Sequence, residues 1–214
     1  MEEGAWLEGP KTRVAVVSGP AHRLLQGERV ALNLLARLSG IATKTCRVLE
    51  RVKKANWMGM LAGSRKTTPG FRLFEKYAVM IGGADGHRFD LSSCVMLKDN
   101  HIDAVGSIEK AIEAARLVAG FTRKIEVECR TETEALRAAA SGADIIMLDN
   151  FSWIDANLAA EKVKLTYPHV IVEVSGGITE DSIVDYAHPH INVISMGSLT
   201  QGVPIVDFSL KIIT

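Results

Sequence analysis

Short apolar runs alternate with amphipathic stretches along most of this chain. Residues 59–64, 94–100, 124–130, 143–150, 169–177 and 192–198 are runs rich in Val, Ile, Leu and Met, which indicate strands. Residues 107–119, 131–141 and 153–167 repeat apolar positions at helical spacing. Thr131 and Glu134 form a capping-box motif at the start of the second of these helices. Strands that alternate in this way with helices predict a parallel sheet buried on both faces.

The first quarter of the chain has a different pattern. Residues 13–20 alternate and contain β-branched residues, which predicts a short strand. Residues 22–56 carry leucine and valine at three- and four-residue spacings, which predicts helix. Ser39 and Gly40 interrupt this stretch and predict a break into two helices.

Two common phosphate-binding motifs are missing from the sequence. No G-x-G-x-x-G follows a first strand, and there is no P-loop. A doubly wound open sheet is therefore less well supported than an α/β barrel, either complete or open, with helices outside about six parallel strands.

Composition sets limits on the partners and the compartment. Of the 214 residues, 47% are hydrophobic and 23% charged, and 25 basic side chains balance 25 acidic ones. No overall field favours nucleic acid or an anionic membrane, so recognition of anions must be local. Three cysteines without metal-type spacing, an N-terminus without an apolar signal region and the lack of a membrane-length apolar run predict a cytoplasmic protein.

Every predicted strand of the repeat ends on polar or glycine residues. Because chemistry in parallel α/β proteins gathers at the carboxyl ends of strands, six such ends in succession favour a site over a solvated rim. The ends carry Arg65 and Lys66; Lys98, Asp99 and Asn100; Glu126 and Glu128; Asp149 and Asn150; Glu173, Ser175, Gly176 and Gly177; and Ser195, Gly197 and Ser198. His87 and Arg88 precede the second strand.

These side chains separate by charge along the chain. The early cations suit a carboxylate-bearing substrate, because arginine can bind a carboxylate through two hydrogen bonds. The later carboxylates suit Mg²⁺, which binds oxygen ligands together with substrate phosphates. The turns "SGGI" and "SMGS" expose backbone N–H groups that suit a phosphate.

Five segments are similar to the quinolinate phosphoribosyltransferase family. They are "GSRKTTPGFR", "HRFDLSSCVMLKDNHI", "IEVECRTETEALRAAASGADIIMLDN", "VEVSGGIT" and "VISMGSLTQ". The resemblance runs from about Gly19 to the end of the chain, with the motifs in order. It implies transfer of phosphoribose from phosphoribosyl pyrophosphate (PRPP) to quinolinate, giving nicotinate mononucleotide, pyrophosphate and CO₂ in NAD biosynthesis.

The resemblance also implies roles for individual residues. The quinolinate pocket is expected to contain Arg65, Lys66, His87, Arg88 and Lys98, and the phosphate cradle Ser175, Gly176, Gly177 and Gly197. Glu128 and Asp149 are expected to bind Mg²⁺ and PRPP and to be catalytic together with Lys66. Arg29 is expected to reach a partner subunit's site, which implies a homodimer or larger homo-oligomer with shared active sites.

The family fold implied by the resemblance is an open α/β barrel behind an N-terminal sandwich domain. Residues 21–214 would form the barrel with its leading helices, and residues 1–20 a remnant strand of the sandwich. Since family members carry more of that domain, a catalytically silent barrel that binds ligand or dimerises with a full-length subunit is the alternative. Transfer to a nicotinate-type acid without decarboxylation and an unrelated phosphate-binding isomerase are further alternatives.

The sequence also gives predictions for three side chains near these motifs. Arg72 and Lys76 lie in a predicted helix and are expected to be solvated. His101 after "KDN" either contributes to the pocket or caps a helix.

Overall fold

The computed structural model describes residues 1–213, and its centre is one parallel sheet. The six strands are β1 (Met60–Ala62), β2 (Val95–Leu97), β3 (Ile125–Cys129), β4 (Ile145–Asp149), β5 (Ile171–Ser175) and β6 (Val193–Ser195). They lie in the order β1-β6-β5-β4-β3-β2, and β1 and β2 are the two edges. All five pairings are parallel, so the predicted open barrel of six parallel strands is confirmed.

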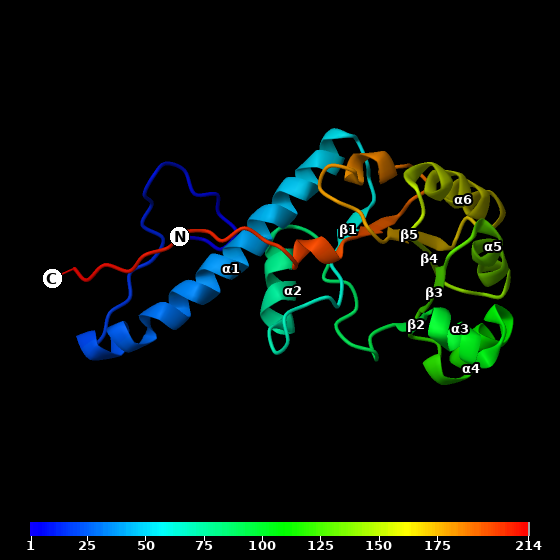
Figure 1. Ribbon diagram of the computed structural model, residues 1–214, viewed down its shortest axis with the longest axis horizontal. Helices are drawn as coiled ribbons and strands as arrows, with labels where there is room; N and C mark the ends of the chain where they lie inside the picture. Colours follow the sequence, from blue (N-terminus) through cyan, green and yellow to red (C-terminus); the bar gives the residue numbers. More distant parts are fainter. Residues whose placement is uncertain (214) are drawn as a thin grey trace.

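The helices predicted between the strands are confirmed and cover the outside of the sheet. The structure contains α1 (Ala21–Lys54), α2 (Arg72–Ile81), α3 (Asp99–Val105), α4 (Ile108–Ala119), α5 (Glu132–Ala140) and α6 (Trp153–Thr166), with 3-10 turns at Ile183–Tyr186 and Gly197–Leu199. Figure 1 shows α4, α5 and α6 side by side outside β2 to β5. Buried alanines on these helices, such as Ala138 and Ala159, permit close approach to the strands.

A segment without regular structure lies at the opening of the sheet. Residues 83–94 run between α2 and β2, and Asp85 forms an isolated parallel bridge with Ala62 beside β1. The Gly63 N–H donates to the Asp85 carbonyl (2.8 Å), and the Asp85 N–H donates to the Leu61 carbonyl (2.9 Å). This segment carries His87 and Arg88 into the gap between the two edge strands.

The predicted break at Ser39–Gly40 is wrong, because α1 is one helix of 34 residues. Gly40 is buried in its middle, and a β-carbon there would overlap the carbonyl oxygen of Pro204. The glycine therefore admits the C-terminal segment against the helix, where the Val206 N–H also donates to the Ala36 carbonyl (3.2 Å). Figure 1 shows both chain ends on the same side of the molecule, near α1 and away from α4 to α6.

This packing predicts opposite effects for two glycines of the same helix. Gly40→Ala should lower the free energy of unfolding by about 2 kcal/mol, because the methyl group displaces the 203–206 segment. Gly27→Ala, with nothing within 4 Å of the new carbon, should raise it by roughly 1 kcal/mol through helix propensity alone. Denaturant unfolding measures both, and a stabilising Gly40→Ala would contradict the packing role.

The strand expected at residues 13–20 is also wrong. No residue from 13 to 20 is in a strand, and among the described residues no strand lies beside this segment. A lone extended segment has no partner for its backbone groups, so its alternating pattern cannot by itself form a strand. No helix in the described part of the chain is both long and apolar enough to cross a bilayer.

Candidate active site

The predicted polar residues gather at the carboxyl edge of the sheet. Asp149 pairs in register with Ser175, and Ala62 with Ser195, so the ends of β4, β5, β6 and β1 are level. The loop after β1, the 83–94 segment and the start of α3 surround this edge. The structure thus brings the candidate cations, carboxylates and glycines to one end of the barrel.

Arg65 and Lys66 lie in the loop after β1. Arg65 is half-buried, and its Nε has no hydrogen-bond partner among the described residues. Lys66 is exposed and crosses Gly197, where a β-carbon would come within 2.7 Å of the lysine Cδ. A buried donor without a partner is costly, which makes this guanidinium a candidate for binding an acceptor group of a ligand.

A buried network holds this basic loop from behind. Glu75 of α2 is completely buried and accepts the Thr68 N–H (3.0 Å) and the Arg37 Nε–H (2.8 Å). The Thr200 hydroxyl donates to the Lys66 carbonyl (2.7 Å). Glu75, Arg37 and Thr200 therefore fix the backbone that presents the two cations.

Sequence reasoning missed these three residues. One signal was available for Glu75, since it shares a helix face with Ala78 and Val79, both buried. A carboxylate at an apolar helix position must find a partner inside the protein. Nothing comparable in the sequence pointed to Arg37 or Thr200.

The expectation that Lys76 is solvated is wrong. Only 5% of this residue is exposed, and its Nζ donates to the Gly86 carbonyl beneath the 83–94 segment. Burial and the neighbouring Arg72 charge lower the pKa of Lys76 from 10.5 to about 8. The half-buried Arg72 reaches the Phe89 carbonyl (3.2 Å), so both side chains support the segment that carries His87.

The lowered pKa of Lys76 predicts a pH-dependent stability. Below pH 8 both folded and unfolded chains bind the proton, and the folded protein carries the full cost of the buried charge. Between pH 8 and 10.5 the unfolded chain binds more protons, so the free energy of unfolding should rise relative to Lys76→Met by about 2 kcal/mol. Urea unfolding of the wild type and of Lys76→Met at pH 7.5 and 10 tests this. A difference in unfolding free energy between the two proteins that is the same at both pH values would contradict the prediction.

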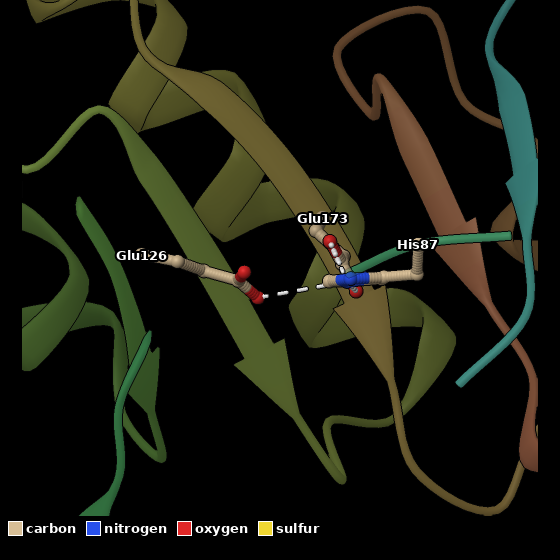
Figure 2. Close-up of side chains that lie close together, drawn as sticks. All are labelled: His87, Glu126 and Glu173. Carbon is tan, nitrogen blue, oxygen red and sulfur yellow. Dashed lines mark hydrogen bonds and ion pairs between the residues drawn. The ribbon is translucent and has the colours of Figure 1, made fainter. Parts of the chain in front are cut away.

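His87 points into the barrel and meets two buried glutamates, as Figure 2 shows. Its Nε2 lies 3.2 Å from each carboxylate oxygen of Glu173 on β5 and 3.9 Å from Oε1 of Glu126 on β3. Burial opposes the imidazolium, but Glu173 and Glu126 outweigh it and raise the pKa of His87. Burial, then the Glu173 charge, raises the pKa of Glu126 to about 7.

Lys98, Glu128 and Asp149 form the acidic side of the site. The Lys98 ammonium pairs with the Glu128 carboxylate, so this lysine links the basic and acidic halves. Burial, then the charge of Glu128, raises the pKa of Asp149, while Lys98 and Lys66 oppose that rise. Asp149, Glu128, Lys98 and Lys66 are therefore close enough for their charges to interact.

His101 caps α3 by accepting the Lys98 N–H (2.9 Å), which answers the open question about its role.

The glycine turns lie beside this acidic group. Gly176 and Gly177 follow β5 with φ of 95° and 66°, a backbone region that favours glycine. A β-carbon at Gly176 would come within 2.7 Å of the Asn150 backbone nitrogen, so the turn also needs glycine for close packing. Ser175 ends β5, and Gly197 begins the last 3-10 turn. Their grouping at one edge is compatible with the predicted phosphate cradle.

Arg29 is the one predicted site residue that the structure does not bring to this edge. It is exposed in the N-terminal half of α1, which projects away from the barrel (Figure 1). Its predicted contact is with a second copy of the chain, so its role stays a prediction.

Comparison with known proteins places this geometry in a family. Family models for the C-terminal and N-terminal domains of quinolinate phosphoribosyl transferase match residues 41–211 and 1–39. Human nicotinate-nucleotide pyrophosphorylase (carboxylating) is 55% identical over 203 residues, covering 95% of this chain and 68% of that protein. A probable enzyme of the same name from Archaeoglobus fulgidus is 46% identical, covering 95% and 79%.

Solved structures agree with these sequence matches. The crystal structure of NadC from Streptococcus pyogenes superposes with a TM-score of 0.82 at 45% identity, covering 90% of this chain and 66% of that one. The chain thus spans about two thirds of the length of the human and streptococcal proteins. With both domain models matched in order and the strand ends carrying the expected residues, this chain belongs to the quinolinate phosphoribosyl transferase family.

Proposed function

We propose that this chain transfers the phosphoribosyl group of PRPP to quinolinate and decarboxylates the product to nicotinate mononucleotide. The observation that carries the proposal is the half-buried Arg65 beside Lys66 at the carboxyl edge of the sheet, whose Nε lacks a partner among the described residues. A dicarboxylate would supply acceptors to Arg65 and to Arg88 together. The names of the relatives agree with this reaction.

The proposed reaction has two steps. The pyridine nitrogen bonds to the anomeric carbon of ribose while the bond from that carbon to the pyrophosphate oxygen breaks. The bond from ring carbon 2 to its carboxylate then breaks, CO₂ leaves, and the carbanion, stabilised by the adjacent cationic nitrogen, takes a proton. Arg65, Lys66 and Arg88 would hold and orient the acid, and positioning of this kind can contribute on the order of 7 kcal/mol.

The carboxylates would act on the ribose. Positive charge develops on the sugar ring as the pyrophosphate leaves, and Glu128 and Asp149 supply negative charge at this edge. We also propose that these two residues hold Mg²⁺, because two mutually repelling carboxylates fit a divalent cation. When bound, the ion would neutralise charge on the pyrophosphate. Chelation of Mg²⁺ should stop turnover while quinolinate still binds.

Incubation of the protein with quinolinate, PRPP and Mg²⁺ tests the function directly. Equal amounts of CO₂ and nicotinate mononucleotide are expected. Quinolinate binding without product would favour the catalytically silent barrel, and product from nicotinate without CO₂ would favour the other acid. Binding of neither quinolinate nor PRPP would overturn the proposal.

We further propose a homodimer with shared sites. Arg29 is exposed on a helix half that also exposes Leu25 and Val30, which suits a second copy of the chain. Arg29→Ala and Asp149→Asn should each be inactive alone. Mixed under conditions that exchange subunits, they should regain about a quarter of wild-type activity, because half of the dimers then contain one intact site. No recovery in a mixture shown to contain mixed dimers would contradict shared sites.

The cytoplasm is the proposed location. Cys46, Cys94 and Cys129 are all free thiols, as expected of a protein in a reducing compartment.

A further inference from the structure

Glu173 has no assigned role, yet it is among the most buried charged groups of the described chain. Only 2% of the residue is exposed, and its hydrogen-bond partner is the His87 ring. Figure 2 shows the Glu173 side chain on β5 meeting the imidazole that enters from the 83–94 segment. A carboxylate placed here at such cost needs a reason beyond packing.

The hydrogen bonds of His87 define how the ring is held. Its Nδ1 accepts the Arg88 backbone N–H (2.7 Å), so in the neutral ring the proton is on Nε2. That Nε2–H donates to the Glu173 carboxylate at 3.2 Å. The ring is therefore fixed at both nitrogens, by Glu173 on one side and by the Arg88 backbone on the other.

The same hydrogen bonds argue against a metal ion among His87, Glu126 and Glu173, although their ligand atoms lie within 4.8 Å of one another. A neutral histidine bound to metal through Nε2 carries its proton on Nδ1. That proton would face the Arg88 N–H, and both groups would be donors. The cluster is better explained as a support for the histidine.

The backbone at His87 needs such a support. Its φ is 56°, in the left-handed region that non-glycine residues rarely adopt. The Asp85 carboxylate accepts the His87 N–H at 2.5 Å. Asp85 therefore holds the His87 backbone, and Glu173 holds the His87 ring. A change at Glu173 would release one of these constraints directly next to Arg88.

Arg88 is the residue whose orientation links this support to binding of the substrate. It is half-buried, and its guanidinium makes no hydrogen bond or ion pair with any described residue. Its direction is set by the backbone that His87 anchors. We propose that Glu173 is a positioning residue for dicarboxylate recognition: through His87 it orients Arg88 toward the acid. This inference rests on the proposed function.

Calorimetry with quinolinate tests the proposal. Glu173→Ala should raise the quinolinate Kd about tenfold, the equivalent of one lost hydrogen bond, and leave PRPP binding unchanged. Glu173→Gln should retain most of the affinity, because the amide oxygen still accepts from Nε2–H. Val174→Ala, at the next buried position of β5, is the matched control and should lose stability without a selective loss of quinolinate.

A double-mutant cycle separates positioning from a general structural effect. In a His87→Ala background, Glu173→Ala should cost no further quinolinate affinity. An equal cost in both backgrounds, or an unchanged Kd in the single variant, would overturn the proposal.

Hydrogen exchange at the Arg88 amide gives a readout that needs no substrate. Exchange should accelerate in Glu173→Ala and stay slow in Glu173→Gln. Faster exchange in a protein whose wild type does not bind quinolinate would show that the proposed function fails while the support of Arg88 holds. Unchanged exchange would show that the support itself is absent.

Discussion

Replacement of Arg65 by alanine should abolish quinolinate binding and leave the fold intact. The half-buried guanidinium has an Nε without a partner in residues 1–213, so its removal breaks no hydrogen bond of that group within the described structure. The lost contact is with the acid, where two charge-assisted hydrogen bonds of roughly 2 kcal/mol each correspond to about a thousandfold in Kd. Calorimetry measures the affinity, and thermal unfolding confirms the fold.

Two variants control this experiment. Arg65→Lys keeps the charge but loses the planar pair of donors, and we expect an affinity between those of wild type and Arg65→Ala. Arg47→Ala removes an exposed arginine of α1 and should bind like wild type. Quinolinate affinity that does not change in Arg65→Ala would remove the main support for the proposed substrate.

The second large effect is expected at Asp149. Asp149→Asn should lower turnover at least a hundredfold, because a neutral amide neither stabilises charge on the ribose nor binds Mg²⁺ well. Quinolinate affinity should change less than about twofold, since Arg65 and Arg88 make the proposed carboxylate contacts. Steady-state kinetics measures the loss of turnover, and calorimetry measures the quinolinate affinity separately.

The same strand supplies a control for Asp149. Asp144 directly precedes β4 at its other end, where it accepts the Ile125 N–H (2.8 Å) and pairs with Arg116. Asp144→Asn should reduce stability but retain turnover. If both asparagine variants lost turnover equally, the effect would reflect damage to β4, and Asp149 would have no special role.

Most of the fold could be predicted from hydrophobic periodicity. The strands and the helices between them depend on local patterns, such as Thr131 capping α5 by accepting the Glu134 N–H. The break in α1 was predicted wrongly because Gly40 serves a contact with Pro204, 164 residues later in the chain, and local pattern does not record such contacts. The strand at 13–20 failed because a strand also requires a neighbour.

The part of the candidate site at the ends of the strands was predictable. Residues such as Arg65 and Asp149 could be located because polar groups at strand ends interrupt apolar runs. Glu75 and Lys76, which lie behind them, are both in α2. The apolar neighbours of Glu75 on that helix indicate that it is buried, but nothing in the sequence of α2 shows which loops the two side chains support. Their roles depend on contacts between α2 and segments before and after it.

The gap in the sheet has a consequence for changing specificity. Residues 83–94 occupy the space between the two edge strands, and apart from the Ala62–Asp85 bridge they belong to none of the strand pairings. A homologous segment of different length or charge could therefore be exchanged at Gly83 and Cys94 without removing a strand from the barrel. The segment that carries His87 and Arg88 could thus be changed separately from the strands that carry Glu128 and Asp149.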